Sequence, residues 1–234
     1  MVNPVLERLY RDNFVVHKNG RRKPVCPPGL TPERGDYLFQ LVRARCPTLT
    51  LEIGFAYGIS TLHIAEALRR NGRGHHIVID PHQRTRFDGL GLGHVEEAGL
   101  SSWITFHEEP AELCLPRLVQ EGFRLDLAFD DSGHLFDHVI TEFVFLAQLL
   151  RTGGVLVVDD AGLPGVGRAC DFVAANRPDF EDVSVAPAPG LLRRLLPGES
   201  LPPPPVNARG KPRMRLFRKA RDDDPRDWSD YKPF

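Results

Sequence analysis

Residues 49–68 read Leu-Thr-Leu-Glu-Ile-Gly-Phe-Ala-Tyr-Gly-Ile-Ser-Thr-Leu-His-Ile-Ala-Glu-Ala-Leu, and this stretch decides the fold. Its first positions are the β-branched and aliphatic residues of a short buried strand. Gly54 and Gly58 follow, Ser60 is expected to cap a helix, and apolar residues then recur at helical spacing. The pattern predicts a strand, a glycine turn and a helix. Such a turn lies at the carboxyl end of a parallel strand, where open α/β sheets bind ligands.

The glycine spacing separates two classes of ligand. A dinucleotide site has Gly-x-Gly-x-x-Gly, which holds a pyrophosphate at the helix end. This chain instead has Glu52-x-Gly54-x-x-x-Gly58. An acid at that position repels a pyrophosphate and suits a cationic ligand. A plain βα unit of a doubly wound sheet remains the alternative interpretation.

The stretch resembles motif I of the class I S-adenosylmethionine-dependent methyltransferases, in the branch of the catechol and macrocin O-methyltransferases. The ligand of that family carries an ammonium and a sulfonium. The resemblance extends over residues 33–220 and implies a Rossmann-like, doubly wound α/β sheet of seven strands, mostly parallel with an antiparallel last strand. The cofactor-binding residues that we expect are Glu52, Gly54, Phe55, Ala56, Gly58, Ser60, Asp80, Pro81, Glu109 and Asp131.

Asp80 ends the second predicted strand, at 75–80. An acid there can accept hydrogen bonds from both ribose hydroxyls of an adenosine ligand, which is its role in the resembled family. The alternative is an aspartate that caps a turn before Pro81. Glu109, after the predicted strand at 103–107, has an equally simple interpretation as a helix cap.

Composition indicates a globular chain. Its 234 residues are 41% hydrophobic and 26% charged, enough for one full core. The net charge of -1 gives no attraction to nucleic acid or to a membrane surface. The four cysteines share no Cys-x-x-Cys spacing, which argues against a zinc ribbon and for a reducing compartment. We expect a cytoplasmic protein with a small-molecule substrate, and a homodimer would be ordinary.

Three regions follow from the pattern. Residues 1–32, which are broken by prolines and contain a basic loop at 18–23, form an N-terminal segment that could cap the substrate. Residues 33–220 form the methyltransferase domain. Residues 221–234 form a charged tail that is mobile or docks on a neighbour.

Later strands are expected at 125–131, 154–160, 180–186 and 213–219, the last an antiparallel edge strand. Helices are expected at 138–150 and 164–176, with a turn at 151–154. The Pro-rich segment 197–206 is either a stiff connection or an SH3-type ligand.

Three acids follow the two central strands. Asp131, Asp159 and Asp160 should meet at one rim of the sheet, where carboxylates repel each other unless a cation joins them. Oxygen ligands suit Mg²⁺ or Ca²⁺. The metal-dependent members of the resembled family place Mg²⁺ at these strand ends, where it binds a substrate hydroxyl. All three acids are therefore candidate metal ligands, and capping of the next helix is the alternative.

His134 and His138 lie four positions apart, as if on one helical face. We interpret His134 as the catalytic candidate, close to the substrate and able to orient it or take its proton. A structural histidine at the rim is the alternative.

The function expected from this pattern is methyl transfer from S-adenosylmethionine to a small-molecule oxygen, assisted by Mg²⁺. A nicotinamide-dependent oxidoreductase is the second hypothesis, disfavoured by the glycine spacing and by the lack of a Tyr-x-x-x-Lys pair. The third is a non-catalytic protein that acts through its Pro-rich segment and tail.

Overall fold

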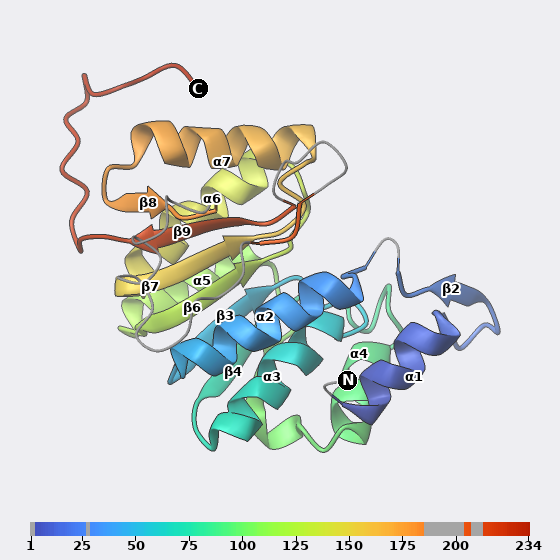
Figure 1. The fold of residues 1–234 in the computed structure, drawn as a ribbon. Coiled ribbons are helices and arrows are strands. Elements are labelled where there is room, and N and C mark those ends of the chain that lie inside the picture. The colour runs from blue at the N-terminus through green and yellow to red at the C-terminus, as the bar shows by residue number, and fades with distance from the viewer. Residues whose placement is uncertain (1–2, 27–28, 185–203, 207–212) are drawn as a thin grey trace.

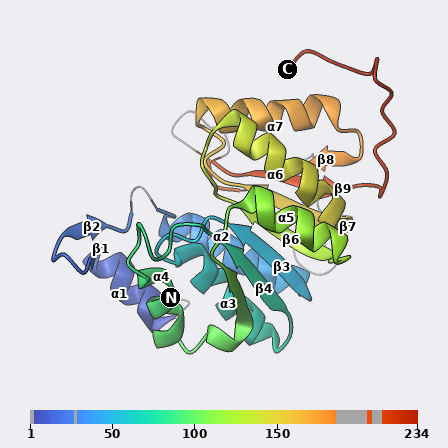
Figure 2. The same ribbon diagram turned by 180° about the vertical axis from the view of Figure 1, so that it is seen from behind.

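A computed structural model describes residues 3–26, 29–184, 204–206 and 213–234. A seven-stranded sheet runs through it in the order β5-β4-β3-β6-β7-β9-β8, with helices on both faces (Figures 1 and 2). Within this sheet β9 runs antiparallel to β7 and β8, and the pairs β5-β4, β4-β3, β3-β6 and β6-β7 are parallel, so the predicted fold class is confirmed. The strands are β3 (Leu49–Ile53), β4 (His75–Ile79), β5 (Ile104–His107), β6 (Leu125–Asp130), β7 (Leu150–Val158), β8 (Phe180–Asp182) and β9 (Arg215–Lys219).

The helices form two layers around this sheet. One layer, nearer the viewer in Figure 1, contains α2 (Pro32–Arg45) and α3 (Ile59–Asn71), with α4 (Leu90–Glu97) and a short 3₁₀ turn at Ser101–Trp103 beside them. The other layer, nearer the viewer in Figure 2, contains α5 (Ala111–Gln120), α6 (Phe136–Leu149) and α7 (Pro164–Asn176). Strand β6 is buried on both faces: Leu127 and Phe129 pack with the first layer, and Leu125 and Ala128 with the second. A near-continuous apolar strand is what a central parallel position requires.

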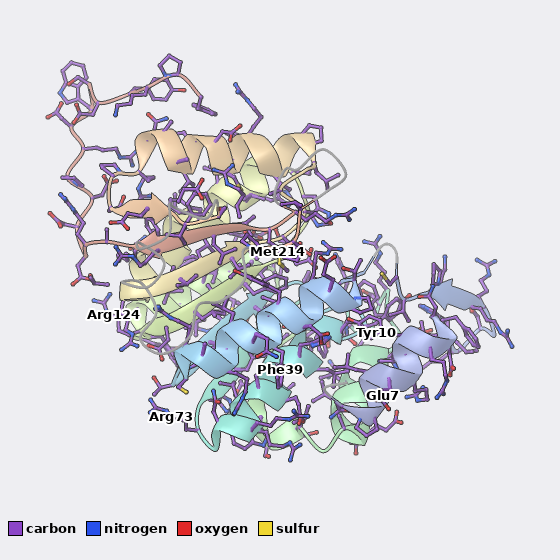
Figure 3. All side chains as sticks on the ribbon, viewed as in Figure 1. Glu7, Tyr10, Phe39, Arg73, Arg124 and Met214 are labelled. Atoms are coloured by element: carbon purple, nitrogen blue, oxygen red, sulfur yellow. The ribbon has the colours of Figure 1, made fainter. Side chains whose placement is uncertain are left out.

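The N-terminal segment contains a β-hairpin that the sequence did not predict. Helix α1 (Pro4–Asp12) leads into a hairpin of β1 (Phe14–Val16) and β2 (Arg22–Pro24), where a basic loop was expected. In Figure 1 this segment lies beside α4. Figure 3 places Arg73 and Arg124, which precede β4 and β6, at the opposite side of the molecule from Tyr10 of α1. The N-terminal segment therefore lies towards the carboxyl ends of the central strands.

Several predicted boundaries were wrong. Helix α3 begins at Ile59 and is capped by the backbone of Gly58, not by Ser60. Strand β7 begins at Leu150, so the expected turn at 151–154 is part of the strand. Strand β9 is an inner strand, hydrogen-bonded to β7 on one side and to β8 on the other, so β8 forms the edge.

The C-terminal tail lies against the helical layer. Lys232 exchanges two backbone-to-side-chain hydrogen bonds with Asn176 at the end of α7. The ring of Phe234 stacks on Phe136 and contacts Phe172, whereas Trp228 is 94% exposed. The Pro-rich segment lies largely outside the described residues, and the three domain boundaries remain predictions. None of the described helices is long and apolar enough to cross a membrane.

Candidate active site

The glycine turn after β3 is packed directly against the end of β6. Gly54 has φ +93° and donates its N–H to the carbonyl of Ile79 at 2.9 Å. A Cβ atom at this position would lie 2.1 Å from the carbonyl oxygen of Asp131. Positive φ and this backbone approach together require glycine. Asp131 in turn donates its N–H to Ile53 at 3.0 Å, so the two strand ends are locked side by side.

Asp80 fixes the shape of this turn. One carboxylate oxygen accepts hydrogen bonds from the N–H groups of Phe55 and Ala56, both at 2.9 Å. The other accepts from the N–H of His82 at 2.7 Å. The side chain is buried, and the described residues use three of the roughly four acceptor positions of its carboxylate. A contact between Asp80 and a ribose stays a prediction.

Gln83 completes the turn and was missed from the sequence. Its side-chain amide donates to the carbonyl of Ala56 at 2.6 Å and accepts from the N–H of Gly91 at 3.1 Å. It is fully buried. Nothing local marks this glutamine among the polar residues after β4, because its role depends on the close approach of Gly91 to the turn.

Glu52 is held entirely inside the protein. Its carboxylate accepts hydrogen bonds from Ser60, from Thr61 at 2.6 Å and from His76 at 2.9 Å, and the side chain is 0% exposed. These contacts tie β3 to α3 and to β4. Glu52 and Ser60 thus connect the strand before the glycine turn with the helix after it. A direct contact of either residue with a cofactor stays a prediction.

The remaining cofactor candidates lie around the turn in different environments. Phe55 is buried against Phe106, whereas Pro81 is exposed. Glu109 lies beyond β5, half-buried, and its carboxylate binds the guanidinium of Arg117. That pairing lowers the pKa of Glu109 and keeps it charged.

The β1–β2 hairpin and the loop after β4 are in contact at the glycine turn, where His17 reaches both Tyr57 and Asp88. His17 lies 2.9 Å from Asp88 and, through its other ring nitrogen, 2.9 Å from the hydroxyl of Tyr57. The N–H of Lys18 also donates to Asp88 at 2.9 Å. Tyr57 packs edge-on against Phe87. The N-terminal segment therefore borders the predicted cofactor site, as a cap would.

His134 lies in the turn after β6, among the predicted acids. Its Nε2 atom is 3.1 Å from Asp131 and 3.6 Å from Asp160. The hydrogen bond with Asp131 raises the pKa of His134, and burial only partly opposes that rise. His134 has φ +57° and precedes α6, so it does not share a helical face with His138, and that expectation was wrong.

Asp130, whose role the sequence left open, faces the other layer. It is buried beside Glu142 of α6, whose carboxylate accepts the hydroxyl of Ser132 at 2.6 Å. Burial raises the pKa of Asp130 to about 6 and that of Glu142 to about 9. Burial beside Asp130 thus favours the neutral form of Glu142. Of the two adjacent aspartates, Asp131 is the one that contacts His134.

Arg34 of α2 occupies the centre of the acidic rim and was also missed. Its Nη1 atom lies 2.7 Å from both carboxylate oxygens of Asp159 and 2.9 Å from one oxygen of Asp160. Arg34 is 4% exposed and Asp159 2%. Burial and the nearby Asp131 raise the pKa of Asp159 to about 7, and Arg34 opposes them. In sequence Arg34 resembled any first-turn residue of an exposed helix.

The predicted magnesium ligands do not form one donor set. Both oxygens of Asp159 contact Arg34, whereas Asp131, His134 and Asp160 offer one atom each within 4.8 Å of one another. That second set mixes two oxygens with an imidazole nitrogen and adjoins a guanidinium. Magnesium prefers six oxygen ligands in near-octahedral geometry. These residues therefore do not fit Mg²⁺ as predicted.

A cleft of about 570 Å³ opens elsewhere, between the ends of α5 and α6 and the start of the tail. It is lined by Phe123, Arg124, Lys219 and Asp222, among others. Since Arg124 precedes β6, this cleft lies at the amino ends of the strands, away from the glycine turn. We do not assign the site to it.

The structure thus has a Rossmann-like sheet, with a glycine turn after β3 and acidic residues at the ends of β6 and β7. Residues 51–161 match the family model described as a methyltransferase domain. The match includes the glycine turn, Asp80 and the acidic strand ends. The predicted resemblance to the class I S-adenosylmethionine-dependent methyltransferases, in the catechol O-methyltransferase-like branch, is confirmed over these residues, which make up just under half of the chain.

Individual relatives agree with that assignment. A catechol O-methyltransferase of Niastella koreensis is 32% identical over 133 residues, 56% of this chain and 57% of the relative. Caffeoyl-CoA O-methyltransferase 2 of Eucalyptus globulus is 32% identical over 131 residues, 55% of this chain and 51% of the relative. The matched region thus spans little more than half of each of these relatives.

Solved structures share the fold. The O-methyltransferase TomG of Streptomyces achromogenes, solved with S-adenosylmethionine, superposes with a TM-score of 0.63 at 24% identity, covering 82% of each chain. An O-methyltransferase of Bacillus cereus, solved with S-adenosylhomocysteine, gives 0.66 at 18% identity, covering 92% of this chain and 90% of the other. At these identities the likeness concerns the fold alone.

Proposed function

We propose that this chain transfers the methyl group of S-adenosylmethionine to a hydroxyl oxygen of a small molecule. The observation that carries the proposal is the juxtaposition of the glycine turn, shaped by Asp80, with Asp131, His134 and Asp160 at the ends of the next strands. One side of this rim suits an adenosyl ligand, and the other suits a hydroxyl whose proton must leave.

The chemistry asked of the protein is limited. A C–O bond forms as the C–S bond breaks, and the sulfonium leaves as a neutral thioether. The hydroxyl proton passes to His134, for which Asp131 and Asp160 stabilise the cationic form. In-line positioning of oxygen and methyl supplies most of the remaining rate. Magnesium is not carried into this proposal, because the predicted ligands do not fit it.

A calorimetric titration separates this function from the oxidoreductase alternative. We expect saturable heat with S-adenosylmethionine and S-adenosylhomocysteine and none with NAD. Transfer of a labelled methyl group to catechol and caffeoyl-CoA, the acceptors named for the relatives, then tests the acceptor class.

His134→Gln should keep S-adenosylhomocysteine binding and lower the transfer rate by about 10²-fold, as loss of a general base does. Binding of NAD in place of the sulfonium donor would contradict the proposal. An unchanged transfer rate in His134→Gln would remove His134 from it. A homodimer and a cytoplasmic location stay predictions.

A further inference from the structure

The acidic rim contains its own buried cation. Arg34 enters from the first turn of α2, where the Thr31 side chain accepts the Arg34 N–H as the helix cap. Among the residues that the structure describes, its carboxylate contacts converge on one atom, Nη1, which touches both oxygens of Asp159 and one of Asp160. Hydrogen bonds between charged groups are stronger than those between neutral groups. Because this pair is almost fully buried, water and salt weaken its electrostatic attraction only slightly.

Arg34 also continues the chain of contacts to His134. It holds one oxygen of Asp160 at 2.9 Å, and the other oxygen of Asp160 lies 3.6 Å from His134 Nε2. Asp131 approaches the same nitrogen at 3.1 Å. Arg34 thereby fixes the orientation of Asp160 without touching the reacting atoms, which makes it a positioning residue.

A divalent ion would compete with this arrangement. Mg²⁺ binds carboxylate oxygens at about 2.0–2.1 Å and tolerates little distortion. An ion bound to Asp159 would need oxygens that Nη1 already contacts, and it would place two positive groups within contact distance. At such a separation in a buried site, the charges of a divalent ion and of the guanidinium repel each other strongly.

We propose that Arg34 supplies the positive charge that the acidic rim requires, so that this site neither binds nor needs a divalent cation. The part of this inference that concerns methyl transfer rests on the proposed function; the part that concerns cation binding does not. Arg34 lies on α2, outside residues 51–161 that match the methyltransferase family model, so that match does not bear on it.

The test titrates MgCl₂ into the chelator-treated full chain by calorimetry and by thermal unfolding. We expect no saturable heat and no shift in unfolding temperature for the wild type. Arg34→Gln leaves the acidic rim without its guanidinium, and we expect it to gain saturable Mg²⁺ binding with a Kd on the order of 10⁻³ M or tighter. Arg34→Lys keeps a positive charge at the position and, like the wild type, should show no saturable heat and no shift in unfolding temperature with MgCl₂.

Arg177→Gln is the matched control. It removes another buried arginine, which pairs with Asp179 through two contacts of 2.6 and 2.8 Å. It should lose stability without gaining Mg²⁺ binding, which separates a general loss of packing from the specific effect at the rim.

Two results would overturn the inference: saturable Mg²⁺ binding by the wild type, or a folded Arg34→Gln protein that shows no saturable Mg²⁺ binding. If Arg34→Gln does not fold, the wild-type titration and the transfer rate in EDTA against added Mg²⁺ decide the question, and a rate that requires Mg²⁺ overturns the inference. Binding of S-adenosylhomocysteine in the same samples keeps the two proposals apart. A chain that binds it and also binds Mg²⁺ refutes only this inference.

Discussion

At the scale of single residues, the site depends on backbone segments that lie too close together for any side chain to fit between them. Gly54 is the clearest case, because strain and collision coincide there: φ is +93°, and an added Cβ would meet the Asp131 carbonyl. Gly20 has a similar φ of +78° but open space around it.

We therefore expect Gly54→Ala to abolish S-adenosylhomocysteine binding and to lower the free energy of unfolding by about 3 kcal/mol or more, the upper end of the cost of local strain. Gly20→Ala carries the φ penalty alone and should cost about 1 kcal/mol with binding intact. Chemical denaturation and calorimetry measure both effects. Equal losses in the two variants would show that the contact with Asp131 does not constrain the turn.

At the scale of elements, Glu52 joins β3, α3 and β4 through buried donors. Ser60, Thr61 and His76 all direct hydrogen bonds to it, and none of them is open to water. Glu66 of α3 is also buried and accepts a long hydrogen bond of 3.4 Å from Asn3, but its charged partners Arg69 and Arg70 are 50% and 42% exposed. The two glutamates thus differ in what their partners can do once the carboxylate is gone.

Glu52→Leu should lower the free energy of unfolding by about 3–5 kcal/mol, because it leaves buried donors unpaired. Glu66→Leu should cost only about 1 kcal/mol, since the arginines regain water. Urea denaturation of both variants measures the difference. If Glu66→Leu proved the more damaging, the buried network would not be what holds the turn to the sheet.

At the scale of the whole molecule, one histidine couples the packing of the N-terminal segment to pH. His63 of α3 lies against Gly35 of α2 and shares a hydrogen bond of 3.2 Å with the hydroxyl of Tyr10 of α1. Figure 3 labels Tyr10. His63 is 2% exposed, and burial lowers its pKa to about 3. The folded protein therefore keeps His63 neutral at pH values where the unfolded chain binds a proton.

The direction of the pH dependence of stability follows from which state, folded or unfolded, binds the proton. Below the unfolded pKa of about 6.5 the unfolded state gains a proton that the folded state refuses, so stability falls as pH decreases, by at most about 1.4 kcal/mol per pH unit from this group. His63→Phe should flatten the pH dependence of the free energy of unfolding between pH 6.5 and 4. Tyr10→Phe removes the hydrogen bond but keeps the buried imidazole, and should retain the slope. A slope unchanged in His63→Phe would assign it to other groups.

Much of the fold could be predicted from sequence because its determinants are local. The apolar runs of β3, β6 and β7, the glycines after β3 and the helix start at Thr31-Pro32 each mark their element within a few residues. The parallel order then follows from the alternation of strands and helices. The hairpin Phe14–Pro24 was missed because each of its strands is only three residues long, and the second, Arg-Lys-Pro, is polar and fully exposed.

The candidate site was predictable only in part. Sequence identified the positions at strand ends, and Asp80, Asp131, His134, Asp159 and Asp160 do lie on one rim. It did not identify their partners. Gln83, Glu142 and Arg34 come from a loop and from two helices, at separations along the chain that no local pattern spans.

A doubly wound sheet with a glycine turn after β3 follows from the amino-acid sequence alone, because strand, turn and helix preferences act between residues that are neighbours in the chain. Only the tertiary structure decided which charge balances the acidic rim. Arg34 and Asp159 stand 125 positions apart, and it is the packing of α2 across the sheet that brings a guanidinium within 2.7 Å of that carboxylate.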